Sequence, residues 1–338
     1  MSNDDKNVLA QQYQKKTDKQ HILDNPDTYI GSVELIDQES YIYEGATNST
    51  SGKVISKEIT FIPGLYKLFD EGIVNCRDHV IRMDSKIRET IHDNAKTTYP
   101  VTHIQVGISD DNVISMQNDG NGIDVVKHPE YDIWIPEMIF GHLRTSTNYD
   151  KSQKKIVGGK NGFGFKLVLI WSSEGTIETV DHVRKLKYVQ HFKQNLDIIE
   201  PPIITKCSAK PYTKISFRPD YKRFGLTNEL SQDMKALLYK RVYDIAAITK
   251  KTLKVSLNGD VLHVKSFPQY VDMYIGTKTE TERVVEETND RWTIIAALSK
   301  TSEFTQVSFV NGIHTSKGGK HVDYILNQIT KKMIGYSM

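Results

Sequence analysis

Glu71 and Asn75 stand four residues apart in a segment whose apolar residues recur at helical spacing. Side chains at i and i+4 share one face of a helix, so a carboxylate and a carboxamide would lie one turn apart. The carboxylate could accept a proton from water, and the amide oxygen could ligate Mg²⁺ beside phosphate oxygens. The same spacing is common on solvated helix faces, and taken alone it favours that simpler interpretation.

A second group of polar residues, Asn118-Asp119-Gly120-Asn121-Gly122, follows a segment that alternates like a strand. A carboxylate at a strand end can accept a hydrogen bond from the exocyclic amino group of a purine. The two glycines let backbone and ligand approach closely. Asp-Gly and Asn-Gly are also favoured turn pairs, so an ordinary hairpin turn remains the alternative.

The glycine-rich run over 158–166 reads GGKNGFGFK and is followed by the apolar LVLIW. Gly159, Gly162 and Gly164 permit a tight backbone whose amides could cradle phosphates at a helix N-terminus, with Lys166 as counter-charge. It is not a Walker A loop, because Gly164 and Lys166 are not adjacent and no Ser or Thr follows. No first Rossmann strand precedes it, which disfavours a dinucleotide site. A surface loop is the alternative.

The elements that must position these groups are predicted from hydrophobic period. Alternating segments predict strands at 58–62, 102–108, 112–119, 175–182, 184–192, 213–220, 291–298 and 305–313. Helical spacing predicts helices over 65–82, over 226–249 with Thr227 as N-cap, and from 321 onward. Asn258-Gly259 predicts a hairpin turn, and a domain boundary is expected near residue 250.

Composition limits the class of protein. The 338 residues suggest about two domains, and 38% hydrophobic with 25% charged residues is typical of a soluble globular chain. The formal net charge of +2 means that any nucleic-acid contact must rest on local patches. Cys76 and Cys207 have no zinc-ligand spacing, and we find no signal peptide or apolar run long enough for a membrane. An intracellular location is therefore expected.

The order of these groups carries more information than any one of them. The Glu71–Asn75 helix, the Asp119 strand end, the glycine loop with Lys166 and a strand containing Thr213 follow one another across about 150 residues. This order resembles the Bergerat ATP-binding fold of the GHKL superfamily. That superfamily includes type II topoisomerases, a heat-shock chaperone, mismatch-repair ATPases and sensor histidine kinases.

Longer segments narrow the resemblance. NPDTYIGSVE, IPGLYKLFDEGIVN, IPEMIFGHLRTSTNYD, GGKNGFGFKL and SFVNGIHTSKGGKHVDY look like the ATPase region of eukaryotic-type DNA topoisomerase II. The resemblance implies an α+β architecture: a GHKL ATP-binding α/β sandwich followed by a partial transducer domain of ribosomal S5 domain 2-like fold. The implied division is an N-terminal strap over 1–30, an ATPase domain over 31–252 and a C-terminally truncated transducer over 253–338.

The resemblance also implies roles for individual residues. Glu71 would be the general base, Asn75 the Mg²⁺ ligand and Lys166 a catalytic counter-charge to the triphosphate. Asp119 would bind the adenine amino group, with Thr213 assisting through water. The other residues implied to contact ATP are Ile123, Ile139, Phe140, Ser146, Thr147, Asn148, Lys160, Asn161, Gly162, Gly164 and, from the partner subunit of a homodimer, Tyr29.

The chain departs from the family pattern in several places. His79 stands where the family usually carries Asn beside the phosphates, Lys160 replaces a common Arg, and Phe165 replaces a small residue. After Tyr324 only 14 residues follow, and none forms the Gln-x-Lys loop whose lysine reaches the γ-phosphate. The DNA-cleavage machinery is missing too, so the chain is expected to be a fragment or one subunit of a split enzyme, with weak turnover alone.

The expected function is an ATP-operated dimerisation gate that closes around double-stranded DNA, with ATP and Mg²⁺ as cofactors, no membrane partner, and a cleavage region supplied elsewhere. A nuclear or viral setting is implied. The alternatives are a GHKL chaperone or mismatch-repair clamp, and a nucleotide-binding subunit that only dimerises. Basic clusters could line a DNA cavity or simply solubilise the surface: Lys250, Lys251, Lys254, Lys317, Lys320, Lys331 and Lys332.

Overall fold

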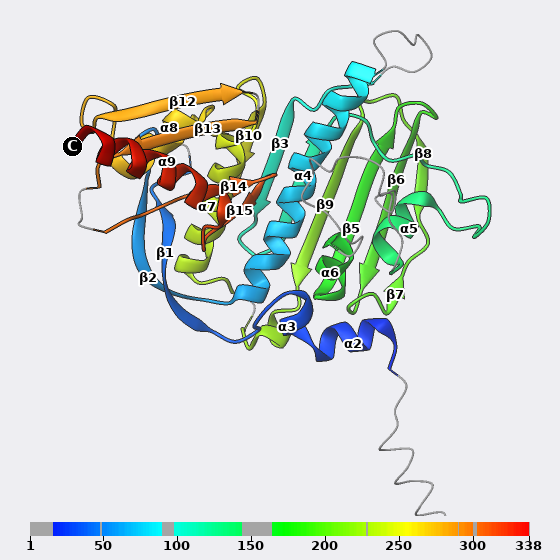
Figure 1. Ribbon diagram of the computed structural model, residues 1–338. Coiled ribbons are helices and arrows are strands. Elements are labelled where there is room, and N and C mark those ends of the chain that lie inside the picture. Colours follow the sequence, from blue (N-terminus) through cyan, green and yellow to red (C-terminus); the bar gives the residue numbers. More distant parts are fainter. Residues whose placement is uncertain are drawn as a thin grey trace, which may run out of the picture.

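The computed structural model describes residues 16–47, 49–89, 98–143, 164–227, 229–289, 291–299 and 303–337. Its main feature is a twisted nine-stranded sheet with helices packed on one of its faces (Figure 1). The order of strands along the sheet is β11-β10-β3-β4-β9-β5-β6-β7, with β8 also pairing with β6. Every pairing is antiparallel except that of β10 with β3.

Most strands of this sheet lie close to where the sequence pattern places them, but β7 and β8 were not predicted. Their bounds are β3 (His103–Ile108), β4 (Ile114–Asp119), β5 (Ser172–Asp181), β6 (Leu186–Lys193), β7 (Ile198–Ile199), β8 (Ile203–Lys206), β9 (Tyr212–Pro219), β10 (Lys254–Leu257) and β11 (Asp260–Val261). The turn at Asn258-Gly259 joins β10 to β11 with positive φ at both residues, as the hairpin prediction requires.

Three helices cover one face of the sheet: α4 (Pro63–Glu89), α5 (Ile135–Gly141) and α6 (Gly164–Ile170) (Figure 1). The face they cover carries the buried residues of each strand, such as Ile114 and Met116 of β4. A Cβ at Gly72 of α4 would lie 2.5 Å from Sδ of Met116, so glycine lets the helix lie directly on the strand. The predicted helix over 65–82 is confirmed as α4.

The helix α7 (Gln232–Ala247) lies beside α4 and packs against β10 and a hairpin of β1 (Ile36–Glu44) and β2 (Lys53–Phe61). It begins six residues later than predicted. The N-cap is Ser231, whose Oγ accepts from the backbone N–H of Met234, and not Thr227. Much of α7 is buried, because neighbours contact it from several sides.

The C-terminal part contains α8 (Phe267–Ile275), β12 (Arg283–Asn289), β13 (Trp292–Ala297), β14 (Phe309–Val310), β15 (Ile313–His314) and α9 (Lys320–Ser337). One strand was predicted over 305–313, and this is wrong. Asn311 and Gly312 both have positive φ and turn the chain into the short hairpin β14–β15. The boundary expected after residue 252 stays a prediction; the strands that follow it, β10 and β11, belong to the large sheet.

The N-terminal segment folds back on the body of its own chain. It forms α2 (Asp18–Asp24) and α3 (Pro26–Tyr29), and Ile22, Leu23 and Ile30 are buried in the main core. A short 3-10 helix, Tyr221–Phe224, follows β9. None of the helices in the described ranges is both long and apolar enough to cross a membrane.

Candidate active site

A polar stripe runs along α4 on the side that faces α6. Glu71 and Asn75 lie one turn apart as predicted, and Nδ2 of Asn75 donates to the backbone carbonyl of Glu71 at 2.6 Å. Lys67, one turn earlier, places Nζ 2.6 Å from Oε1 of Glu71. A carboxylate with a cation on one oxygen keeps its other oxygen for a further hydrogen bond.

The N-terminus of α6 meets this stripe. A Cβ at Gly164 would lie 2.3 Å from Oε2 of Glu71 and 3.8 Å from Nδ2 of Asn75. A larger residue at the start of α6 would therefore displace the carboxylate of Glu71 from its present position. The sequence separation of about 90 residues makes this meeting a tertiary contact, and it brings two separately predicted groups into one site.

Lys166 is in the first turn of α6 and is 2% exposed. Burial lowers the pKa of its ammonium to about 8. An anionic ligand reaching this point would meet a cation that has already lost most of its water. Six residues predicted to contact ATP are Ser146, Thr147, Asn148, Lys160, Asn161 and Gly162, and they lie outside the described residues.

The carboxylate of Asp119, which is predicted to bind the adenine amino group, has other partners in the structure. Side chains alternate along β4, and Asp119 points away from α4 together with Ser115 and Gln117. Its carboxylate accepts hydrogen bonds from the backbone N–H groups of Thr102 at 2.7 Å and His103 at 2.9 Å. It therefore caps the N-terminal end of β3. Asn118 is in phase with the buried Met116 and points toward α4.

Asn118 begins a row of polar groups across three neighbouring strands. It is directly opposite Thr213 of β9, which is in turn opposite Thr179 of β5. Oγ1 of Thr179 lies 2.9 Å from Oγ1 of Thr213 and accepts from the backbone N–H of Ile123 at 3.0 Å. Thr213 and the backbone of Ile123 thus both contact the hydroxyl of Thr179. The sequence analysis missed Asn118 and Thr179, although alternation with Ile114 and Met116 would have indicated Asn118.

His79 occupies the next turn of α4 after Asn75. Its Nε2 lies 3.0 Å from the carbonyl oxygen of Asn121, which can only accept, so the imidazole carries its proton on Nε2. Burial, with the positive charge of Arg82, lowers the pKa of His79 to about 4. His79 is therefore neutral near pH 7 and holds the turn that follows β4.

Apolar and aromatic residues named in the sequence analysis also have defined positions in the structure. Phe165 packs edge-on against Phe140 of α5, with ring centroids 5.5 Å apart, and Ile139 is half-buried against the same core. Phe165 therefore contributes to the packing of α6 against α5. Tyr29 is near the end of α3, and its hydroxyl lies 3.1 Å from Nδ1 of His21 in the same chain.

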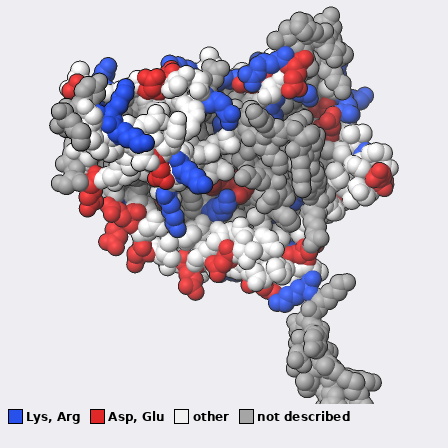
Figure 2. Space-filling model, in the orientation of Figure 1, with Lys and Arg blue, Asp and Glu red and all other residues white. Residues whose placement is uncertain are grey.

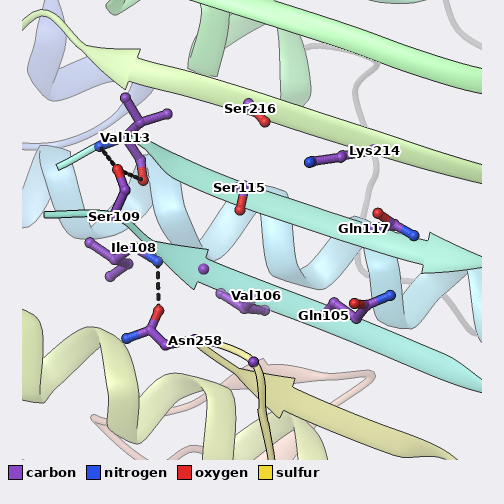
Figure 3. A pocket seen from close by; sticks show the side chains of 12 residues that line it. Gln105, Val106, Ile108, Ser109, Val113, Ser115, Gln117, Lys214, Ser216 and Asn258 are labelled. Carbon is purple, nitrogen blue, oxygen red and sulfur yellow. Dashed lines mark hydrogen bonds between the residues drawn. The ribbon is translucent and has the colours of Figure 1, made fainter. Parts of the chain in front are cut away.

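An open hollow lies away from this site. It is an open groove of about 540 Å³ on the opposite face of the sheet. Figure 3 shows polar side chains extending from β3, β4 and β9 into it, with α4 behind the strands. Its lining includes Gln105, Ser115, Gln117, Lys214 and Ser216. The groove follows from a sheet that is covered on one face only, and none of the predicted site residues lines it.

Comparisons with known proteins agree with this geometry. The ATPase region of Saccharomyces cerevisiae topoisomerase II superposes with a TM-score of 0.85 at 41% identity, over 97% of this chain and 81% of that one. The ATPase and transducer domains of DNA topoisomerase II from Balamuthia mandrillaris give a TM-score of 0.82 at 40% identity, over 96% and 78%. A family model described as DNA gyrase B matches residues 266–338.

Full-length relatives give the same result. DNA topoisomerase 2 of Arabidopsis thaliana is 44% identical over 334 residues, which is 97% of this chain and 21% of the relative. DNA topoisomerase 2 of Acanthamoeba polyphaga mimivirus is 42% identical over 331 residues, or 97% and 25%. The chain therefore spans a fifth to a quarter of the curated relatives it matches.

Fold and site together define an α+β protein of the GHKL type, with ATPase and transducer parts. The chain belongs to the DNA topoisomerase II family and corresponds to its ATPase region.

Proposed function

We propose that this chain binds and hydrolyses ATP and acts as the ATP-operated dimerisation gate of a type II DNA topoisomerase. One observation carries the proposal: Glu71 and Asn75 of α4 meet the N-terminus of α6 at Gly164. This places a candidate base and a candidate metal ligand beside the backbone N–H groups of a helix start. Helix N-termini and nearby ammonium groups are suited to phosphate, and Lys166 is in the same turn.

In the proposed reaction Glu71 accepts a proton from the water that attacks the terminal phosphate. Lys67 contacts Oε1, which fixes the carboxylate and leaves Oε2 toward α6. Phosphoryl transfer needs positioning and charge stabilisation more than covalent chemistry by the protein. Lys166 supplies positive charge in a nearly dry environment, where it acts more strongly than at the surface.

Asn75 fits the ligand set of Mg²⁺. Its Nδ2 is committed to the carbonyl of Glu71, which turns Oδ1 in the opposite direction. The described residues contain no cluster of three or more His, Cys, Asp or Glu that could hold a metal. Mg²⁺ at nucleotide sites takes few protein ligands and completes its shell with phosphate oxygens and water, so one amide oxygen can contribute. When bound, the ion neutralises charge on the phosphates.

The polar row across the sheet is the proposed place of the purine edge. Asn118 and Thr213 face the same side as α4, and a carboxamide can both accept from and donate to an adenine edge. Ile123 follows this row and is half-buried against the core, so it can contact the flat face of the base. We therefore assign the adenine contact to Asn118 in place of Asp119.

For the gate, we propose that two copies close when ATP binds. The strap over 1–30 would carry Tyr29 toward the partner's site, which requires it to leave His21 of its own chain. The part from residue 262 onward would act as the transducer. A DNA-cleavage region elsewhere in the enzyme would complete strand passage.

DNA contact would rest on exposed lysines. Figure 2 shows acidic side chains along the edge formed by β1 and β2, and basic ones over α9 and the β14–β15 hairpin. Lys317, Lys320, Lys331 and Lys332 are exposed in this C-terminal part. Lys250, in contrast, already pairs with Asp84 at 2.7 Å. Affinity for DNA would fall steeply with salt if these lysines contact phosphates.

The gate is tested by the mass of the chain in solution with a non-hydrolysable ATP analogue and Mg²⁺. We expect a monomer without nucleotide and a dimer with it, and Tyr29→Ala should weaken the dimer. Tyr131→Ala, which changes an exposed tyrosine, is the matched control. A mass that does not respond to nucleotide would contradict the gate.

A further inference from the structure

Arg241 is a fully buried cation that joins two distant parts of the chain. It is on α7 and is 0% exposed. Its Nε donates to Oδ1 of Asp70 on α4 at 2.6 Å, and its Nη2 donates to the carbonyl oxygen of Gly312 at 2.7 Å. A single guanidinium therefore holds the helix of the candidate base and the turn of the β14–β15 hairpin.

The turn itself is fitted closely between two arginines. Gly312 has a φ of +85°, and a Cβ there would lie 2.8 Å from Cδ of Arg77. Arg77 belongs to α4, two residues after Asn75. The backbone of Asn311-Gly312 thus rests on the side chain of Arg77 and reaches Arg241 through its carbonyl. Space for a larger residue is absent on this side of the turn.

The other charges around Arg241 make its position specific. Asp244 accepts from Nζ of Lys240 at 3.0 Å and from the hydroxyl of Tyr270 at 2.5 Å, and it lies 3.7 Å from Nη1 of Arg241. Nη1 makes no hydrogen bond to a described residue. Two of the three guanidinium nitrogens are therefore committed, one to α4 and one to the hairpin.

Asp70 is the neighbour of Glu71 and shares a cation with it. Nζ of Lys67 lies 2.6 Å from Glu71 and 4.0 Å from Asp70. The two carboxylates leave α4 in different directions, about 100° apart, because they are consecutive in a helix. Because Asp70 and Glu71 are consecutive, a shift of Asp70 relative to Arg241 would also displace the backbone that carries Glu71.

We propose that Arg241 is a positioning residue that couples the Asn311-Gly312 turn to Glu71 through Asp70. Movement of the C-terminal hairpin then changes the rate of hydrolysis without changing the residues that contact ATP. The inference rests on the proposed role of Glu71 as general base. When the turn moves, Arg241 moves with it through its hydrogen bond to the carbonyl of Gly312. Asp70, which is paired with Arg241, then moves with α4.

The planar fork of arginine is essential to this role. Lysine has one nitrogen on a flexible stem, so it cannot hold the carboxylate of Asp70 and the carbonyl of Gly312 in fixed relative positions. The variant Arg241→Lys keeps the buried positive charge and removes the fixed geometry. It thus separates positioning from simple charge neutralisation in the core.

The test uses Gly312→Ala with Gly259→Ala as its control. Both glycines follow an Asn in a two-residue turn with positive φ, but nothing lies within 4 Å of a Cβ at Gly259. Both variants bear the same backbone strain, and only Gly312→Ala displaces its turn from Arg77 and Arg241. We expect Gly312→Ala to lower kcat about tenfold with KM unchanged, and to speed hydrogen exchange in the middle of α4. Gly259→Ala should match the parent in both measurements.

Arg241→Lys and the double variant Arg241→Lys/Gly312→Ala complete a double-mutant cycle with Gly312→Ala. We expect the double variant to be no slower than Arg241→Lys alone, because both changes break one link. Additive losses, or equal effects of Gly312→Ala and Gly259→Ala, would overturn the coupling. If the parent chain shows no ATP turnover, the proposed function fails, and hydrogen exchange in α4 still decides the coupling: unchanged exchange in Gly312→Ala rejects it.

Discussion

A Cβ at Gly164 would lie 2.3 Å from Oε2 of Glu71, so the start of α6 and the candidate base are in direct contact. Gly164→Ala should therefore push the carboxylate out of place and lower hydrolysis by at least about tenfold. The expected change in the free energy of unfolding is small, below about 1 kcal/mol, because the displaced atom is the end of a flexible side chain. Urea unfolding and ATP turnover measure the two effects. Gly335→Ala, in open space on α9, is the control; it should leave ATP turnover unchanged and should not lower the free energy of unfolding, because alanine favours a helix.

The exchange of roles between Asn118 and Asp119 is directly testable. Asn118→Ala should weaken ATP binding by about tenfold, because it removes the carboxamide that faces the purine edge. Asp119→Asn keeps an acceptor for Thr102 and should leave ATP affinity within about twofold of the parent. Titration calorimetry with ATP and GTP measures both. A larger loss of affinity in Asp119→Asn than in Asn118→Ala would restore the original assignment.

His79 should make the protein sensitive to acid. The pKa of its imidazole is about 4 in the folded chain and near 6.5 when unfolded, so the unfolded state binds more protons between these values. The stabilisation from neutral His79 is present above pH 6.5 and is lost as the pH falls toward 4, on the order of 3 kcal/mol. His79→Asn should reduce this loss. Urea unfolding at pH 7 and pH 4.5 tests it, and an identical pH dependence in the variant would contradict it.

Lys166 should set the upper pH limit of nucleotide binding. Because the triphosphate binds the protonated ammonium, ATP affinity should fall as the pH rises through about 8, the pKa of Lys166 in the free chain. Lys166→Met should bind ATP weakly at every pH, with a flat profile in this range. Lys214→Met, in the groove on the opposite face, should keep the parent profile. A flat profile in the parent would show that Lys166 is not the group responsible.

Local pattern in the sequence predicts much of this fold because its elements follow simple periods. The alternation of β3, β4, β5, β6 and β9, the helical spacing after Pro63 and the turn at Asn258-Gly259 appear in the structure. The second strand of the N-terminal hairpin is also recognisable. Its partner β1 was missed, since IDQESYIYE contains several exposed polar residues in succession and no clear alternation. Pairing with β2 makes it a strand.

The remaining features depend on contacts between distant residues. Arg241 and Asp70 are 171 residues apart, and no local period indicates that they pair. The N-cap of helix α7 is Ser231. The sequence analysis chose Thr227, because this residue is the first one in the segment that can act as an N-cap. The side of the sheet to which Asp119 points could have been predicted by counting from Ile114. Alternation places the side chain of Asp119 on the face of β4 that does not carry Met116. The site residues over 144–163 remain predictions.

The central claim is that Glu71 is the base of an ATP-hydrolysing site, and Glu71→Gln tests it most directly. The amide keeps the size of the side chain and removes its ability to accept the proton. ATP binding should stay within about threefold of the parent, while turnover at saturating ATP and Mg²⁺ should fall by at least about a hundredfold. Glu58→Gln, an exposed change on β2, should behave like the parent. Turnover in Glu71→Gln close to that of the parent would contradict the account.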